Sequence, residues 1–156
     1  MRITLERIVM EQKKTLFRIL SHSAKETESA GILLASQLKG DEFVAMYGDL
    51  GAGKTAFVRG VASVIAPMYD VSSPTYTIVN EYGEGKGRLC HFDMYRIDSE
   101  DDLESIGFYD YTDCILIAEW SENIPYALPK SYYSVTIEKL SENERIITIE
   151  FVEAVK

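Results

Sequence analysis

The stretch "YGDLGAGKTAFVRG" at residues 47–60 decides the fold expected of this chain. It follows an apolar run and contains G-x-x-x-x-G-K-[ST], the pattern of a phosphate-binding loop, with Gly48, Gly53, Lys54 and Thr55 at its fixed positions. Glycine permits the backbone angles that turn successive N–H groups toward an anion, and the N-terminus of the following helix adds positive charge there. The stretch therefore predicts a strand, a phosphate-binding loop and a helix.

Nucleotide contacts are expected along the backbone of this loop and at two of its side chains. The Lys54 ammonium is expected to reach the β- and γ-phosphates, and the Thr55 hydroxyl to bind Mg²⁺. A glycine-rich turn with a solvated lysine is the alternative, but the expected strand–loop–helix context favours the nucleotide. The sequence lacks the Asn-Lys-x-Asp pattern that selects guanine, which favours ATP. The loop residues expected to contact ATP are Gly48, Asp49, Leu50, Gly51, Ala52, Gly53, Lys54, Thr55 and Ala56.

Length and composition predict one domain, residues 1–156, with a sizeable core. A net charge of −9 is unfavourable for holding nucleic acid or anionic lipid without a partner. No apolar run approaches membrane-spanning length, and the N-terminal segment has no signal-peptide core. We therefore expect a cytoplasmic protein with no membrane partner, with residues 1–13 as a candidate N-terminal extension and with Cys90 and Cys114 as buried thiols.

Regular patterns outside the loop indicate the remaining elements. Residues 14–20 are predicted to form a strand, and residues 21–40 a helix with Ser23 and Glu26 at capping-box spacing and Gly40 as its stop. One face of that helix carries small and apolar residues at helical spacing, which would let another element approach closely. That face consists of Thr27, Gly31, Leu34 and Leu38.

Two hairpins, a short helix and a central strand complete the architecture. One hairpin is expected at residues 75–82 with 87–95, and the other at residues 132–140 with 144–153. The short helix is expected at residues 99–111 and the central strand at residues 113–120. Together the elements predict an α/β fold, a three-layer sandwich of the P-loop NTPase type. Its sheet is expected to be mostly parallel, with antiparallel hairpin additions.

Two strands are expected to end in a carboxylate near the loop. Asp93 ends "RLCHFD" and Glu119 ends "ILIAE", and the carboxyl ends of neighbouring parallel strands meet at one edge of a sheet. One acid could bind Mg²⁺ directly or through water while the other orients the attacking water; strand-end acids in solvent are the alternative. His91 lies two residues before Asp93 on the same strand face, and is interpreted as structural, with proton handling as the functional alternative.

Thr75 and Trp120 are further candidates at the same edge. Thr75 lies in "SPTYT", at the point where many P-loop proteins place a sensor of the γ-phosphate; an ordinary turn is the alternative. Trp120 is the sole tryptophan and directly follows Glu119, so contact with the nucleotide competes with simple packing at a strand end.

Arginine is scarce after the expected P-loop helix, where only Arg88, Arg96 and Arg145 occur. None stands out as an arginine finger, so we expect slow intrinsic turnover. A small-molecule kinase on the same loop is the second function considered, and the missing arginine-rich lid argues against it. A non-hydrolysing, ATP-gated binding module is the third.

Four stretches in this order, "YGDLGAGKT", "SPTYT", "HFDMYRI" and "AEW", resemble the bacterial TsaE (YjeE) ATPases of tRNA threonylcarbamoyladenosine synthesis. The resemblance covers residues 14–150. It implies that Glu119 is the Mg²⁺ ligand and Asp93 a Walker B-type acid. The implied metal-binding set is Thr55, Glu119 and Asp93, and the implied catalytic set is Lys54, Asp93 and Thr75. Outside the loop, the positions that match the family's nucleotide site are Thr27, Trp120 and Arg145.

The resemblance also implies partners and a role. In this family TsaD, with TsaB, transfers the threonylcarbamoyl group to the adenosine beside the anticodon. The chain would be the ATP-binding, weakly hydrolysing, Mg²⁺-dependent subunit that supports this cycle without performing the transfer. It would meet tRNA only indirectly, through the complex, which agrees with its acidic charge.

Overall fold

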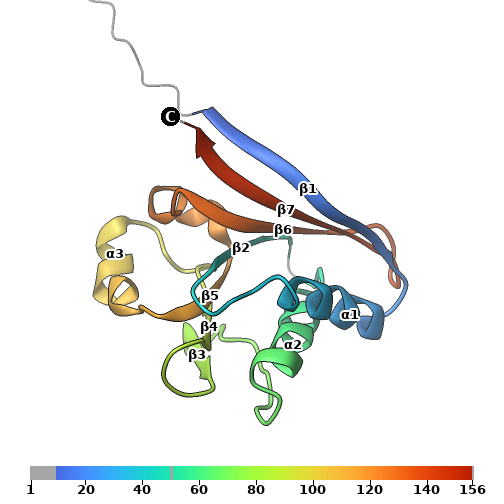
Figure 1. Cartoon of the computed structure of the whole chain (residues 1–156), viewed down its shortest axis with the longest axis horizontal. Coiled ribbons are helices and arrows are strands. Elements are labelled where there is room, and N and C mark those ends of the chain that lie inside the picture. Colours follow the sequence, from blue (N-terminus) through green and yellow to red (C-terminus); the bar gives the residue numbers. More distant parts are fainter. Residues whose placement is uncertain (1–9, 50, 156) are drawn as a thin grey trace, which may run out of the picture.

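The computed structural model describes residues 10–49 and 51–155, and these form one seven-stranded sheet with helices on both faces (Figure 1). The strand order is β1-β7-β6-β2-β5-β4-β3. The strands are β1 Met10–Ser21, β2 Phe43–Tyr47, β3 Val79–Tyr82, β4 Arg88–Asp93, β5 Cys114–Glu119, β6 Ser131–Lys139 and β7 Arg145–Val155. The α-helices are α1 Ala24–Ala35, α2 Lys54–Ile65 and α3 Glu100–Ser105, with 3-10 turns η1 Phe108–Asp110, η2 Ser121–Asn123 and η3 Pro125–Ala127.

The four central strands, β6, β2, β5 and β4, run parallel, and antiparallel partners extend the sheet at both edges. The predicted hairpins are confirmed as β3–β4 and β6–β7. In the parallel register Asp93 pairs with Glu119, and Met46 at the end of β2 also pairs with Glu119. Both strand-end acids therefore lie at the carboxyl ends of the central strands, where the predicted phosphate-binding loop leaves β2.

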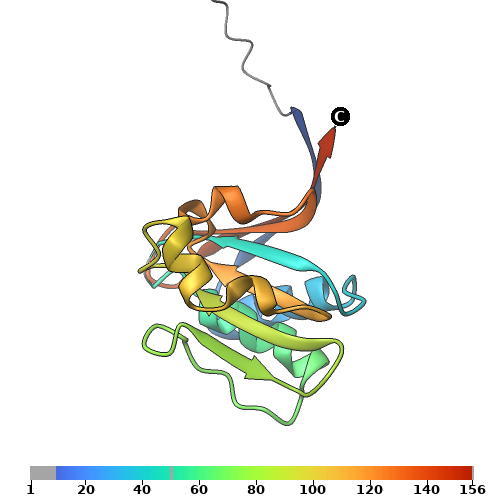
Figure 2. The ribbon, with the colours of Figure 1, turned by 90° about the vertical axis from the view of Figure 1, so that its left-hand side faces the viewer.

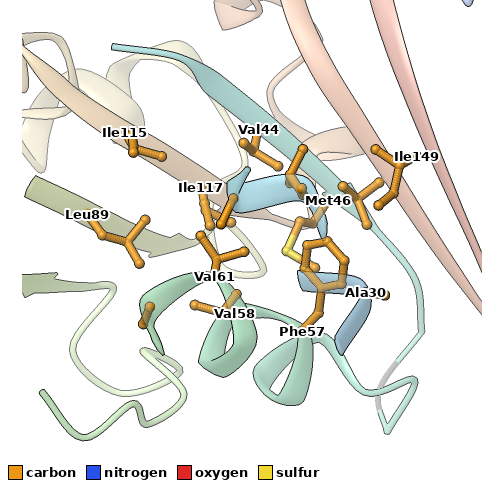
Figure 3. Close-up of a cluster of buried hydrophobic side chains, with 14 of the residues drawn as sticks. Ala30, Val44, Met46, Phe57, Val58, Val61, Leu89, Ile115, Ile117 and Ile149 are labelled. Atoms are coloured by element: carbon orange, nitrogen blue, oxygen red, sulfur yellow. The ribbon is translucent and has the colours of Figure 1, made fainter. Parts of the chain in front are cut away.

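Alternate residues of the central strands enter two cores on opposite faces of the sheet. On one face Leu89, Ile115 and Ile117 pack with Val58 and Val61 of α2 (Figure 3). On the other face lie the buried residues Phe92, Leu116, Leu103 of α3, Phe108 of η1 and Ile124. Helices α1 and α2 thus form one layer and the α3–η segments another, which confirms the predicted three-layer α/β sandwich.

Helix α1 begins as predicted, because Ser23 Oγ accepts a hydrogen bond from the Glu26 N–H at 3.1 Å. A Cβ at Gly31 would lie 2.1 Å from the carbonyl oxygen of Phe57, so the absence of a side chain lets α1 lie against α2. The predicted end at Gly40 was wrong. The helix ends at Ala35, after which the Gln37 N–H donates to the Leu34 carbonyl, three residues earlier, as in a 3-10 turn. Leu38 lies beyond the helix and packs on the core.

Strand β1 begins four residues before the predicted residue 14, and Met10 to Thr15 pair with β7. Residues 10–13 of the candidate extension therefore belong to the sheet, while residues 1–9 lie outside the described residues. The polar sequence of residues 10–13 gave no strand signal, because residues 11–15 are exposed at an outer strand of the sheet. The β1–β7 ribbon extends beyond the rest of the sheet (Figures 1 and 2).

Strand β3 is shorter than predicted, because residues 75–77 form a turn. Ile78 has φ 70°, its N–H donates to the Pro74 carbonyl, and its own carbonyl accepts from the Asp93 N–H at 2.9 Å. The turn is thereby tied to the end of β4. Helix α3 is likewise shorter than the predicted 99–111, with Ser99 as its N-cap.

Two further observations concern cysteines and membranes. Cys90 and Cys114 are buried free thiols, as predicted. In the described part of the chain, no helix is long and apolar enough to cross a membrane.

Candidate functional site

The glycine-rich loop that was predicted to bind phosphate turns directly into α2 at Gly53. Gly53 is the residue before the helix and has φ 104°, a backbone conformation that an L side chain rarely adopts. It allows the loop to bring its N–H groups and the positive end of α2 to one place. Leu50, one of the predicted contacts in this loop, lies outside the described residues.

Lys54 is buried at the start of α2, with 7% of its surface exposed. Its ammonium donates a hydrogen bond to the Gly48 carbonyl at 2.6 Å and lies 4.2 Å from the centre of the Trp120 ring. Burial lowers the pKa of Lys54, and the charges of Glu119 and Asp93 oppose that shift. An anionic group entering here would meet an ammonium already removed from water and aimed at the loop.

A pocket of about 300 Å³ opens over this lysine. It is lined by Gly51, Ala52, Gly53, Lys54, Thr55, Ser73, Thr75, Asp93, Glu119 and Trp120. Residues predicted from four separate stretches of the sequence therefore line one pocket. Thr75 Oγ1 donates to Asp93 Oδ2 at 3.3 Å and shares a 2.7 Å hydrogen bond with the Ser73 hydroxyl, so the "SPT" turn is linked to the acid at the end of β4.

The side-chain oxygens in this pocket are of the kind that Mg²⁺ prefers as ligands. Asp93 and Glu119 are 8% and 3% exposed, and Thr55 contributes a hydroxyl to the same lining. Within residues 10–49 and 51–155 there is no cluster of three or more His, Cys, Asp or Glu side chains that could hold a metal alone. One or two carboxylates with a hydroxyl and substrate phosphates is the usual Mg²⁺ arrangement, and these residues fit it.

Trp120 has the left-handed backbone angles φ 58° and ψ 43°, which a non-glycine residue adopts at some cost. Its indole packs on the Tyr95 ring, with centroids 5.0 Å apart, and also lies over Lys54. The strained residue after Glu119 thus places an aromatic face in the pocket wall.

His91 lies beside the pocket and is fully buried. Its Nε2 is 3.2 Å from Glu119 Oε2, but the contact lacks hydrogen-bond alignment, and neither ring nitrogen has a hydrogen-bond partner among the described residues.

A second hollow of about 230 Å³ adjoins the first at Gly53. Its lining includes Thr27, Ala56 and Arg145, three of the predicted nucleotide contacts. The Arg145 guanidinium donates to the carbonyls of Ala52 and Gly51 at 3.0 and 3.2 Å, which braces the loop against the β6–β7 turn.

Two predicted contacts, Gly48 and Asp49, line neither hollow. Gly48 instead accepts the Lys54 hydrogen bond, and Asp49 is exposed. Sequence reasoning missed Ser73, although it immediately precedes Pro74 in the "SPTYT" stretch that singled out Thr75. It also missed Asn143, for which the sequence carries no signal.

Comparisons with known proteins agree with one another. The family model described as threonylcarbamoyl adenosine biosynthesis protein TsaE matches residues 21–147. The tRNA threonylcarbamoyladenosine biosynthesis protein TsaE of Haemophilus influenzae is 40% identical over 119 residues, 75% of this chain and 75% of that protein. The protein of that name from Bacillus subtilis is 34% identical over 124 residues, 80% and 78% of the two chains. The crystal structure of Bacillus subtilis YdiB superposes with a TM-score of 0.66 at 28% identity, covering 93% of this chain and 88% of that one.

Proposed function

This chain belongs to the TsaE family, and from that premise we propose that it is an Mg²⁺-dependent ATPase that supports threonylcarbamoyladenosine modification of tRNA. The observation that carries the proposal is the single pocket in which Lys54, Thr55, Asp93 and Glu119 converge at the N-terminus of α2. An ammonium, a hydroxyl and two carboxylates are the side chains that a P-loop enzyme uses around a triphosphate.

Each side chain has a distinct task in this proposal. Lys54 and the loop N–H groups bind the phosphates, and Arg145 holds the loop in shape through its backbone carbonyls. Thr55 and Glu119 hold Mg²⁺, which when bound neutralises charge on the β- and γ-phosphates. Asp93 orients the attacking water, and its hydrogen bond with Thr75 lets the "SPT" turn respond to the γ-phosphate. Thr27 and Ala56, in the adjoining hollow, contact the nucleoside part of ATP.

Turnover by the isolated chain should be slow, because no arginine lines the phosphate pocket within the described residues. Arg88 is paired with Glu81 at 3.0 Å, and Arg96 lies over the Tyr76 ring at 5.9 Å. The same scarcity disfavours the small-molecule kinase, which needs cations on the transferring phosphoryl group. We propose that TsaB and TsaD complete the site in the cytoplasm, and that tRNA is met only through them.

The test is phosphate release from ATP by the chain alone, by TsaB with TsaD, and by all three proteins together. We expect the mixture to exceed the sum of its parts by at least about tenfold, because a partner can order the "SPT" turn and exclude water. The Lys54→Ala chain in the same mixture is the control and should give no stimulation. Equal release from the isolated chain and the mixture would overturn the partner-dependent mechanism.

A further inference from the structure

We propose that His91 is a positioning residue for the Glu119 carboxylate, an inference that rests on the Mg²⁺ role proposed for Glu119. The two residues belong to the neighbouring parallel strands β4 and β5, where His91 pairs with Ile117. Glu119 is two residues beyond Ile117, so both side chains project from the same face of the sheet. Their closest atoms, His91 Nε2 and Glu119 Oε2, are 3.2 Å apart.

The surroundings of His91 indicate that the imidazole is present for its polar atoms. It is fully buried. Leu89, two residues earlier in β4, and Ile117, its partner in β5, lie on the same face and are apolar core residues. A buried imidazole with no hydrogen-bond partner destabilises the fold relative to an apolar side chain of similar size. In the described part of the chain, Glu119 is the one acid whose carboxylate lies within ion-pair distance of this ring. Among the described residues, Glu119 is therefore the partner that the structure offers to the polar atoms of His91.

A neutral imidazole with its proton on Nε2 has the donor that this contact requires. In this proposal the ring turns so that the N–H points at Glu119 Oε2, and the 3.2 Å approach becomes a hydrogen bond. That bond engages one carboxylate oxygen and fixes the plane of the group, leaving the other oxygen for the pocket. Partners of this kind orient metal ligands, and their loss typically lowers metal affinity by about 10–100-fold.

Two substitutions separate this role from simple packing. His91→Leu removes the N–H donor and introduces an apolar side chain of similar size. His91→Gln keeps an N–H donor near the position of Nε2. Calorimetry would measure the affinity of each full-length chain for a non-hydrolysable ATP analogue over a series of Mg²⁺ concentrations. Thermal unfolding of the same samples reports the fold, and the Glu119→Ala chain provides the background for a double-mutant cycle.

We expect His91→Leu to lower the apparent Mg²⁺ affinity by about tenfold, with Tm unchanged or raised and with affinity for the metal-free analogue unchanged. We expect His91→Gln to remain close to the unmodified chain, and His91→Leu to have no further effect in the Glu119→Ala background. If the leucine variant fails to fold, His91→Met replaces it with the same expectation.

Unchanged Mg²⁺ affinity in the donor-free variant would overturn the proposal while leaving the proposed ATPase intact. Equal losses in the leucine and glutamine variants, accompanied by a fall in Tm, would assign His91 a packing role and also overturn it. Binding of the analogue by the unmodified chain that does not depend on Mg²⁺ would instead remove the proposed metal site, and His91's role with it.

Discussion

Two of the hollows described in this molecule lie at opposite ends of the central parallel strands, and the smaller of these two holds the residues of the proposed ATP site. The phosphate pocket, about 300 Å³, lies at the carboxyl ends of β4 and β5. The other, about 510 Å³, lies where β2, β5 and β6 begin, and is lined by aromatic side chains together with Lys39, Asp41, Glu42 and Asp113. Volume alone would select the larger hollow, which lacks the residues of the proposed site.

The two hollows differ in the burial of their charged side chains: Lys39, Asp41 and Asp113 are exposed, whereas the charged side chains of the phosphate pocket are buried. In the larger hollow the Glu42 carboxylate accepts hydrogen bonds from the backbone N–H groups of Lys39, Gly40 and Asp41 at 2.8–3.1 Å. Burial raises the pKa of Glu42, but these hydrogen bonds outweigh it and the pKa lies below its usual value. The Glu42 carboxylate therefore stabilises the turn formed by residues 39–41. In the phosphate pocket a buried ammonium, two buried acids and a helix N-terminus face one space, and His91 beside it has no hydrogen-bond partner among the described residues.

The largest effect expected is from Lys54→Ala, which should lower ATP affinity by about 100-fold or more while the protein stays folded. Charge-assisted hydrogen bonds to the phosphates account for a loss of this size. Calorimetry with ATP and Mg²⁺, alongside circular dichroism, would measure it. Lys39→Ala in the larger hollow is the matched control and should bind ATP normally. Equal ATP affinity of the Lys54→Ala and Lys39→Ala chains would show that Lys54 does not distinguish the phosphate pocket from the larger hollow.

Asp93→Ala should mainly lower turnover, by about 100-fold in the mixture with TsaB and TsaD, while ATP affinity changes little. A group that orients the attacking water acts on the transition state more than on the bound substrate. Phosphate release at saturating ATP would measure the effect, with Asp41→Ala as the control at the opposite end of the strands. Normal turnover by the Asp93 variant would remove this assignment.

Glu119→Ala should weaken Mg²⁺-dependent ATP binding by about tenfold, the change expected when one charge-assisted contact is lost. Affinity for ATP in the presence of a chelator should stay nearly the same. Calorimetric titrations with and without Mg²⁺ would separate the two quantities. An equal loss under both conditions would show that Glu119 acts on the fold or on the nucleotide itself.

How far these assignments follow from the sequence depends on the kind of signal. Lys54 and Thr55 follow from a fixed spacing, and Asp93 and Glu119 from acids at the ends of apolar strands. The polar edge strand at residues 10–13 could not be predicted, because an exposed ribbon has no apolar alternation. The bracing of the loop by Arg145 could not be predicted either. Its two hydrogen bonds, to Ala52 and Gly51, join residues that are separated in the chain by 93 and 94 positions.

The smallest effect expected is at Glu42. Because the folded-state pKa of Glu42 lies below its usual value of 4.5, the ionised carboxylate stabilises the fold above that pH. The stabilisation is lost as the pH falls through the folded-state pKa. Glu42→Gln should therefore have a lower Tm than the unmodified chain at neutral pH, and the gap should close in acid. ATP binding should not change; a loss of binding would show that the two hollows are coupled.

Binding of ATP in the pocket over Lys54 can be followed through the fluorescence emission of Trp120. This residue is the sole tryptophan, and its ring lies 4.2 Å from the Lys54 ammonium in the pocket wall. A titration with ATP and Mg²⁺ should shift or quench the emission in a saturable way, and the Lys54→Ala chain should respond much less at the same concentrations. A flat titration, in a sample shown by calorimetry to bind ATP, would contradict binding of the nucleotide in this pocket and place it elsewhere.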